Sequence, residues 1–104
     1  MTETEIFKAL ADPTRRAVFE KLAAGPLNAT ELRFGMSISQ PAMSQHLAVL
    51  RGAGLVREAK EGRAVRYWLA PEGLRPLNDW MRRYSRFWPE RIGELETLLK
   101  EMDQ

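Results

Sequence analysis

The sequence predicts a single, mainly α-helical domain that carries one short two-stranded β-ribbon. Apolar residues recur every three or four positions over most of the chain, as they do on the buried face of helices. Between residues 55 and 70 this period changes to the alternation of a β-strand. The length of 104 residues and the 44% apolar content suit one domain with a thin core. A core this small is a reason to expect an apolar surface shared with a second copy.

Two helices are predicted before the first break in the chain. Residues 3–11 have the pattern of a short amphipathic helix. Asp12 follows it and is placed to cap the next helix, whose first position suits Pro13. Gly25 and Pro26 then end the second helix, because neither residue favours a helix interior.

A third helix and a fourth are predicted within residues 28–54. The side chain of Asn28 can cap the third helix while Glu31 reaches back, which makes a capping box. We expect this helix to end near Gly35 and to be joined to Ser39 by about three or four residues. Two helices joined by so short a turn predict a helix-turn-helix.

The fourth helix, between Ser39 and Gly54, has the outer face of a helix that enters a DNA groove. Ser39 is its expected N-cap, and glycines end it. Lys and Glu usually cover the exposed face of a surface helix, whereas this face carries small and hydrogen-bonding residues. Such residues allow close approach to base edges. They are Pro41, Ser44, Gln45 and Ala48.

The two-stranded ribbon is predicted over residues 55–70, with residues 61–63 as its connection. A ribbon of two strands is marginal alone and needs the helices to pack against. So packed, it becomes a wing beside the fourth helix, with Lys60 and Arg63 at its tip.

Basic residues are concentrated just after the fourth helix, although the net charge is only +2. Residues 51–70 contain five basic and two acidic residues. Contacts from such cations to phosphates supply most sequence-independent affinity for nucleic acid. A solvated hairpin is the alternative that charge alone leaves open. The candidates for phosphate contact are Arg51, Arg57, Lys60, Arg63 and Arg66.

One long helix is predicted over residues 74–102, and Pro89 is expected to kink it. Its apolar and aromatic stripe is larger than the core of so small a domain can cover, which favours a dimer interface over a lid on the core. The first helix is expected to share this interface. The residues assigned to it are Ile6, Phe7, Leu10, Trp80, Tyr84, Phe87, Trp88, Ile92 and Leu95.

Composition excludes several classes of protein. With no cysteine and one histidine, the chain cannot form a disulfide or a tetrahedral metal site, so no metal or other cofactor is expected. There is no glycine-rich phosphate loop and no nucleophile-base arrangement, so an enzyme is not expected. The chain has neither a signal peptide nor a transmembrane run, which predicts a cytoplasmic protein without a membrane partner.

The order of these elements, with the stretches ALADPTRRAVFEKLA, SISQPAMSQHLAVLRGAGLV and EGRAVRYWL, resembles the ArsR/SmtB-type winged helix-turn-helix transcriptional repressors. The resemblance covers nearly the whole chain. It implies a homodimer whose two recognition helices read an inverted-repeat operator in double-stranded DNA and repress transcription. The positions that match the recognition motif are Ser39, Gln40, Ser44, Gln45 and His46, with Arg63 at the wing tip.

This resemblance assigns residues 1–104 to one winged-helix domain. Its helix-turn-helix is residues 28–54, its wing is residues 55–70, and its dimerisation helices are residues 1–11 and 74–102.

The chemistry of the matched positions agrees with DNA contact. Gln40 and Gln45 can pair with adenine, and Ser44 can contact a base or a phosphate. Thr30, near the start of the third helix, can meet a phosphate. His46 lies at the edge of the apolar face, which leaves both packing and a phosphate contact open.

The chain departs from the metal-sensing members of that family at both of their usual metal sites. Residues 33–35, Arg-Phe-Gly, stand where a Cys-x-Cys pair is usual, and no histidine follows Asp79. A regulator that does not respond to metal is therefore expected, with a small-molecule or protein effector left open. The alternative is a winged-helix protein-interaction module without DNA binding, against which the polar face of the fourth helix argues.

Overall fold

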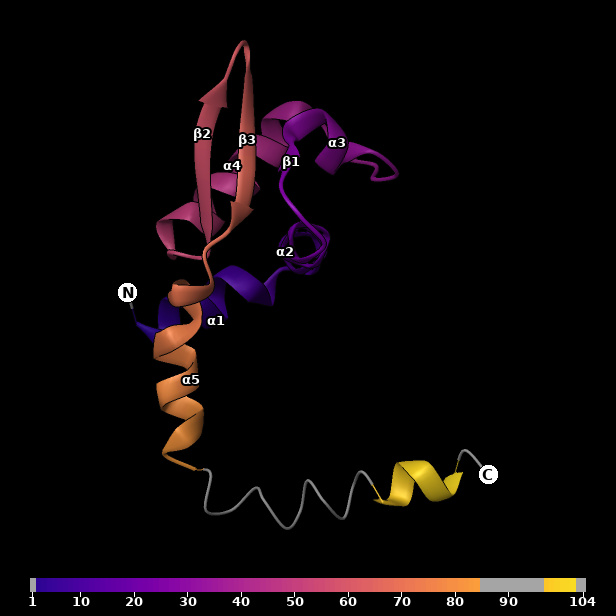
Figure 1. Ribbon diagram of the computed structural model, residues 1–104, viewed down its shortest axis with the longest axis vertical. Coiled ribbons are helices and arrows are strands. Elements are labelled where there is room, and N and C mark those ends of the chain that lie inside the picture. The colour runs from indigo at the N-terminus through magenta and orange to yellow at the C-terminus, as the bar shows by residue number, and fades with distance from the viewer. Residues whose placement is uncertain (1, 85–96, 103–104) are drawn as a thin grey trace.

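The computed structural model describes residues 2–84 and 97–102, and it is mainly helical with one small sheet (Figure 1). The first four helices begin and end within about two residues of the positions that the sequence predicts. The elements follow in the order α1 (Glu3–Ala11), α2 (Pro13–Ala23), β1 (Leu27–Asn28), α3 (Ala29–Arg33), α4 (Gln40–Gly52), β2 (Val56–Glu61), β3 (Ala64–Leu69), the 3-10 helix η1 (Pro71–Leu74) and α5 (Arg75–Arg82). Residues 97–102 are also helical.

Capping side chains fix where the helices start. The Asp12 carboxylate accepts a hydrogen bond from the first turn of α2 at 2.9 Å. The predicted capping box is confirmed, with Asn28 and Glu31 each accepting from the other's backbone N–H, at 2.8 and 2.9 Å respectively. Ser39 Oγ accepts from the backbone N–H of Ala42 at 3.2 Å. Each cap satisfies a backbone donor that has no partner within its own helix.

The connection between α3 and α4 is longer than the sequence suggested. It runs over residues 34–39, because α3 already ends at Arg33. The ammonium group of Lys21, on α2, donates to the carbonyls of Leu32 and Phe34 at 3.0 and 2.7 Å. A cation from a neighbouring helix thus binds carbonyls that α3 leaves without an intrahelical donor.

The expected two-stranded ribbon is part of a three-stranded antiparallel sheet with the strand order β1-β3-β2. The third strand is β1, whose Leu27 pairs with Tyr67 of β3. Glu61 lies in β2 rather than in the connection, so the turn at the tip is Gly62-Arg63 alone. Gly62 has φ 66°, as the first position of a two-residue type II′ turn requires. A strand of two residues is too short to show a period in the sequence.

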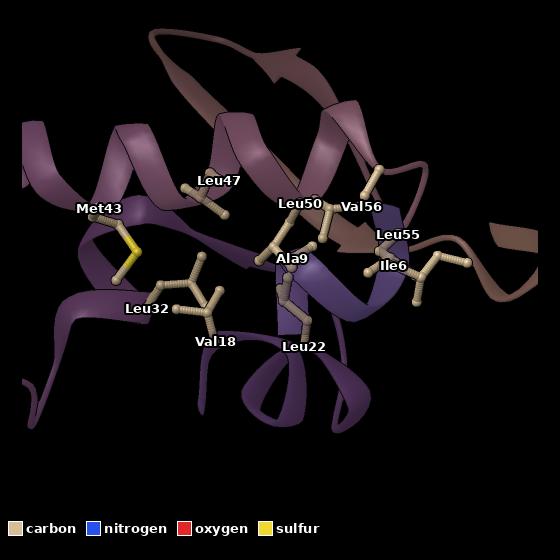
Figure 2. Close-up of a cluster of buried hydrophobic side chains, with 11 residues drawn as sticks. Ile6, Ala9, Val18, Leu22, Leu32, Met43, Leu47, Leu50, Leu55 and Val56 are labelled. Atoms are coloured by element: carbon tan, nitrogen blue, oxygen red, sulfur yellow. The ribbon is translucent and has the colours of Figure 1, made fainter. Parts of the chain in front are cut away.

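The core lies between α4 and the first three helices. Figure 2 shows Met43, Leu47 and Leu50 pointing from α4 toward side chains of α1, α2 and α3. Each fully buried side chain of this size contributes about 1.5–3 kcal/mol through removal of apolar surface from water. The apolar side of α4 is therefore fixed, and its opposite side stays exposed. The core residues are Ile6, Ala9, Val18, Leu22, Leu32, Met43, Leu47, Leu50, Ala53, Leu55 and Val56.

A close backbone contact joins the end of α4 to η1. Gly54, with φ 79°, ends the turn after α4, and the backbone N–H of Ala70 donates to the carbonyl of Leu55 at 2.9 Å. Gly73 then approaches so closely that a Cβ atom placed on it would lie 1.9 Å from the carbonyl oxygen of Gly54. Only glycine fits at position 73.

The C-terminal part was expected to be one helix over residues 74–102. Instead, residues 71–74 form the 3-10 helix η1, and α5 begins at Arg75. Residues 85–96 lie outside the described residues, so the kink expected at Pro89 stays a prediction. In the described part of the chain, no helix is both long and apolar enough to cross a membrane.

Candidate nucleic-acid interface

The outer face of α4 is exposed along its length. Ser44, Gln45 and Ala48 are exposed on the side opposite the core, and Gln40 is exposed at the start of the helix. Thirteen residues make α4 about 20 Å long. The neutral side chains on this face add little to the width of the helix. The helix can therefore fit into a major groove about 12 Å wide.

Four of the predicted contact residues line a single groove beside this helix. Thr30 comes from α3, Gln40 and Ser44 from α4, and Arg63 from the hairpin tip. The groove has a volume of about 410 Å³. Backbone pairing brings α3 close to the hairpin, because β1 pairs with β3 and leads directly into α3. Strand β1 was not predicted from the sequence, so the proximity of these four residues was not predicted either.

Most of the basic residues that are candidates for phosphate contact form ion pairs within the chain. Three of the five form ion pairs with carboxylates of the same chain: Arg51 with Glu58, Arg57 with Glu72, and Arg66 with Glu61. Among the residues that the structure describes, Lys60 and Arg63 have no acidic partner. Both are exposed at the end of the β2–β3 hairpin, which projects from the helices (Figure 1). The electrostatic attraction of the hairpin for an anion is therefore concentrated at its tip.

Ser39 already has a role within the fold. Its hydroxyl oxygen accepts the Ala42 N–H as the N-cap of α4, while its own proton stays free to donate. Because the side chain is exposed, a phosphate oxygen can accept that proton without loss of the cap. The predicted contact at Ser39 is compatible with its structural role.

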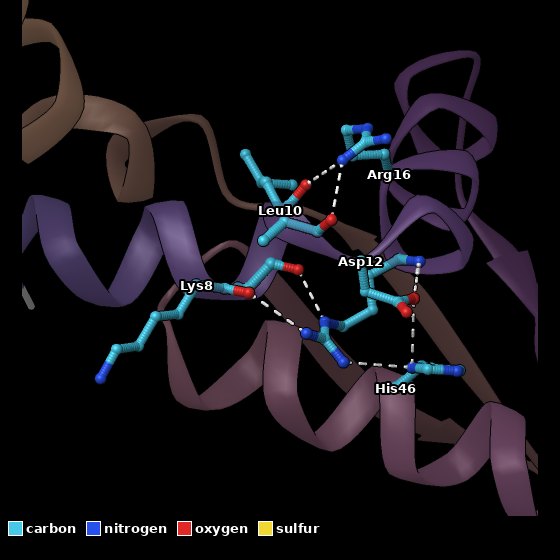
Figure 3. Close-up of polar contacts among 8 residues, drawn as sticks. Lys8, Leu10, Asp12, Arg16 and His46 are labelled. Atoms are coloured by element: carbon cyan, nitrogen blue, oxygen red, sulfur yellow. Dashed lines mark hydrogen bonds and ion pairs between the residues drawn. The ribbon is translucent and has the colours of Figure 1, made fainter.

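His46 faces the junction of α1 and α2 and not the outer side of α4 (Figure 3). Its Nδ1 lies 3.4 Å from Nη1 of Arg15 and 3.8 Å from Oδ2 of Asp12. With 22% of its side chain exposed, His46 fits the packing alternative better than a phosphate contact.

The Asp12 carboxylate at this junction has a lowered pKa. The main cause is the hydrogen bond from the Arg15 backbone N–H, and the charges of His46 and Arg15 lower the pKa further against the opposing effect of desolvation. A carboxylate stabilised in its ionised form keeps a negative charge facing the His46 ring.

The residues assigned to a dimer interface fall into three groups. Ile6 is fully buried in the core of its own chain and is not available to a partner, and Leu10 packs against the same core. Phe7, Trp80 and Tyr84 form an aromatic cluster, with ring centroids 5.3 Å apart for the first pair and 5.1 Å for the second. Phe7 is 44% and Tyr84 40% exposed. The remaining four lie outside the described residues: Phe87, Trp88, Ile92 and Leu95.

No group of three or more histidine, cysteine or acidic side chains within residues 2–84 and 97–102 is arranged to hold a metal ion. Phe34 is 85% exposed in the loop before α4.

Known proteins are similar to this chain over most of its length. A family model described as a helix-turn-helix domain matches residues 10–59. The HTH-type transcriptional regulator Rv2034 of Mycobacterium tuberculosis is 46% identical over 86 residues, which cover 83% of this chain and 78% of that protein. The transcriptional repressor SdpR of Bacillus subtilis is 33% identical over 76 residues, covering 73% of this chain and 84% of that protein.

The fold is shared with solved structures as well. The crystal structure of an ArsR family transcriptional regulator, RHA00566, matches with a TM-score of 0.74 and 33% sequence identity. The match covers 82% of this chain and 88% of that one. Sequence and fold thus point to the same group of proteins.

Proposed function

We propose that this chain, which belongs to the ArsR/SmtB-type family of winged helix-turn-helix regulators, is a dimeric repressor that binds an inverted-repeat operator and does not respond to metal. The chain is a DNA-binding transcriptional regulator and not an enzyme. The observation that carries the finer proposal is the groove lined by Thr30, Gln40, Ser44 and Arg63, which joins the start of α4 to the hairpin tip.

The proposed contacts divide into base reading and phosphate binding. Gln45, Gln40 and Ser44 project from the exposed side of α4 and are assigned to base edges in the major groove. Lys60 and Arg63 at the hairpin tip are assigned to phosphates and to the adjacent minor groove. Thr30 and Ser39 are assigned to phosphates beside the recognition helix. His46 is left out of the contact set because it faces Asp12 and Arg15.

Dimerisation is supported by the exposed apolar surface over α1 and α5. Phe7, Met81 and Tyr84 are each at least 40% exposed, and the first and last of them contact Trp80. An exposed aromatic surface of this kind is typical of an interface. A two-fold dimer sets two recognition helices about 34 Å apart, one turn of DNA, and thereby reads an inverted repeat.

Independence from metal is supported by the composition of the chain. A single histidine and no cysteine leave only carboxylates as further ligands, which do not make the usual tetrahedral nitrogen and sulfur site. Release from the operator is therefore assigned to an effector other than a transition metal.

Fluorescence anisotropy tests DNA binding directly. The 104-residue chain is titrated into a labelled random duplex at low salt, and then into fragments that it selects from a random pool. We expect salt-dependent binding to the first and much tighter binding to the second, with inverted repeats among the selected fragments. The absence of salt-dependent binding would instead indicate a protein-interaction module. Sedimentation of the free protein tests the dimer, and a monomer at high micromolar concentration refutes it.

A further inference from the structure

Two neighbouring arginines of α2 cap the C-terminal end of α1 (Figure 3). The last four carbonyls of a helix have no donor within it, and cations are favoured at that end. Here all four accept hydrogen bonds from guanidinium groups, at 2.6 to 3.1 Å. The acceptors are Lys8 and Ala9 for Arg15, and Leu10 and Ala11 for Arg16.

Arg15 differs from Arg16 in having a further contact, with the recognition helix. Its Nη1 lies 3.4 Å from Nδ1 of His46, near the middle of α4. A guanidinium can only donate, so this contact is a hydrogen bond in the tautomer whose Nδ1 carries no proton. Asp12, whose carboxylate caps α2, lies on the same side of the ring at 3.8 Å. The Arg15 side chain thus connects the end of α1, the start of α2 and the middle of α4.

The position of His46 on α4 makes this contact sensitive to rotation of the helix. His46 directly follows Ser44 and Gln45 and precedes the buried Leu47, so it lies between the exposed and the buried sides. Apolar contacts hold α4 against the core, but they are not directional. A hydrogen bond is directional and fixes an angle.

We propose that Arg15 is a positioning residue for DNA recognition, which sets the orientation of α4 by joining His46 to the last carbonyls of α1. This inference rests on the proposed DNA binding by α4. The proposal assigns two roles to α1, because Phe7 of the same helix also belongs to the proposed dimer surface. The angle at which each subunit presents α4 is thereby tied to the helix that pairs the subunits.

Substitution of the two arginines provides a matched test. Arg15→Met and Arg16→Met each remove two hydrogen bonds to α1, and only the first removes the contact with α4. For Arg15→Met we expect affinity for the selected operator to fall about tenfold, with an unchanged salt slope, because no phosphate contact is lost. For Arg16→Met we expect a change below about twofold. Equal losses for both variants overturn the proposal, as does a salt slope reduced by about one in Arg15→Met.

His46→Ala tests the contact from its other end and leaves both arginine caps of α1 in place. We expect a loss of operator affinity similar to that of Arg15→Met, and little further loss in the double variant. Residues that act through one contact are not additive, whereas independent residues are. Additive losses therefore overturn the proposal, and so does a flatter salt slope in His46→Ala alone, which would assign His46 to a phosphate.

Amide hydrogen exchange tests the positioning role without DNA. We expect faster exchange across residues 40–52 in Arg15→Met than in Arg16→Met at matched global stability, because local opening of α4 becomes easier. Identical exchange in the two variants overturns the proposal. If the unmodified protein binds no DNA, the proposed function fails on its own, and this exchange measurement still decides whether Arg15 holds α4.

Discussion

The recognition helix α4 and the β2–β3 hairpin reach the same groove, but different forces hold them in place. α4 is fixed by fully or nearly fully buried side chains and presents neutral, short residues outward. Most residues of the hairpin are exposed or only half-buried, and its flanks carry ion pairs. Buried apolar contacts are strong and insensitive to salt, whereas exposed ion pairs contribute little and are screened.

Under the function proposed above, this difference separates the specificity of DNA binding from its affinity within one small domain. Base reading by Gln45 or Ser44 needs a helix placed to within a fraction of an ångström, and α4 has the packing for it. The phosphate contacts proposed for Lys60 and Arg63 act over several ångströms and need less exact placement. Substitutions in the two regions are therefore expected to differ in size and in their response to salt.

Loss of packing under α4 is expected to have the largest effect. Leu50 is fully buried, so Leu50→Ala should lower the free energy of unfolding by about 2–5 kcal/mol through lost transfer energy and a cavity. The neighbouring Val49 is 43% exposed, and Val49→Ala should change it by less than about 0.5 kcal/mol. Urea denaturation measures both. A loss for Leu50→Ala no larger than for Val49→Ala would show that α4 is not held by this core.

The next largest effect is expected at the close backbone contact between η1 and the turn after α4. Gly73→Ala places a Cβ atom against the backbone of Gly54, which should cost about 1–3 kcal/mol of unfolding free energy, as overpacking does. Gly52→Ala is the matched control, because a Cβ atom there meets nothing within 4 Å. Gly52→Ala should be neutral or stabilising by up to about 1 kcal/mol. Thermal unfolding of both variants checks this, and similar melting temperatures would contradict the close contact.

Base reading by α4 is tested with Gln45→Ala. If Gln45 pairs with a base, binding of the selected operator should weaken by about 1–3 kcal/mol while binding of unrelated duplexes hardly changes. Anisotropy titrations with the operator and a scrambled duplex measure the two quantities. Equal losses on both would assign Gln45 to the DNA backbone.

The hairpin tip should show the opposite behaviour. Arg63→Ala is expected to weaken binding to all sequences by about 1 kcal/mol and to lower the salt slope by about one. Arg66→Ala is its control, since the Arg66 guanidinium is paired with Glu61, and its salt slope should stay close to that of the unmodified protein. A slope reduced equally in both variants would mean that the ion pair leaves Arg66 free to bind phosphate.

The sequence predicted the helices well, because their starts depend on local chemistry. Asp12, Asn28 and Ser39 each cap a helix that follows directly, and the periodic apolar residues of α4 are those that are buried. The capping side chain and its backbone partner are three residues apart, so both are visible in a short window of sequence.

Contacts between distant parts of the chain were not predictable in the same way. Strand β1 pairs with residues about 40 positions later, and its two residues carry no period. Clustering of basic residues suggested five phosphate contacts, but the carboxylates of Glu58, Glu61 and Glu72 pair with three of them. Which charges remain free depends on strand register and on the fold of η1. Likewise, the periodicity of Ile6 showed that it is buried but not which surface buries it.

The smallest effect is expected from Glu61→Gln, which directly tests whether an ion pair limits phosphate contact by an arginine of the hairpin. Glu61 is the last residue of β2, and its carboxylate binds the Arg66 guanidinium. The stability should change by less than about 1 kcal/mol, because the pair is exposed. Removal of the negative charge frees a cation near the hairpin tip, so binding to any duplex should tighten by up to about fivefold at low salt, with a steeper salt slope. The double variant Glu61→Gln with Arg66→Ala should lose this gain. If instead the gain persists without Arg66, it arises from reduced repulsion between Glu61 and phosphate, and the ion pair does not restrain the hairpin's attraction for DNA.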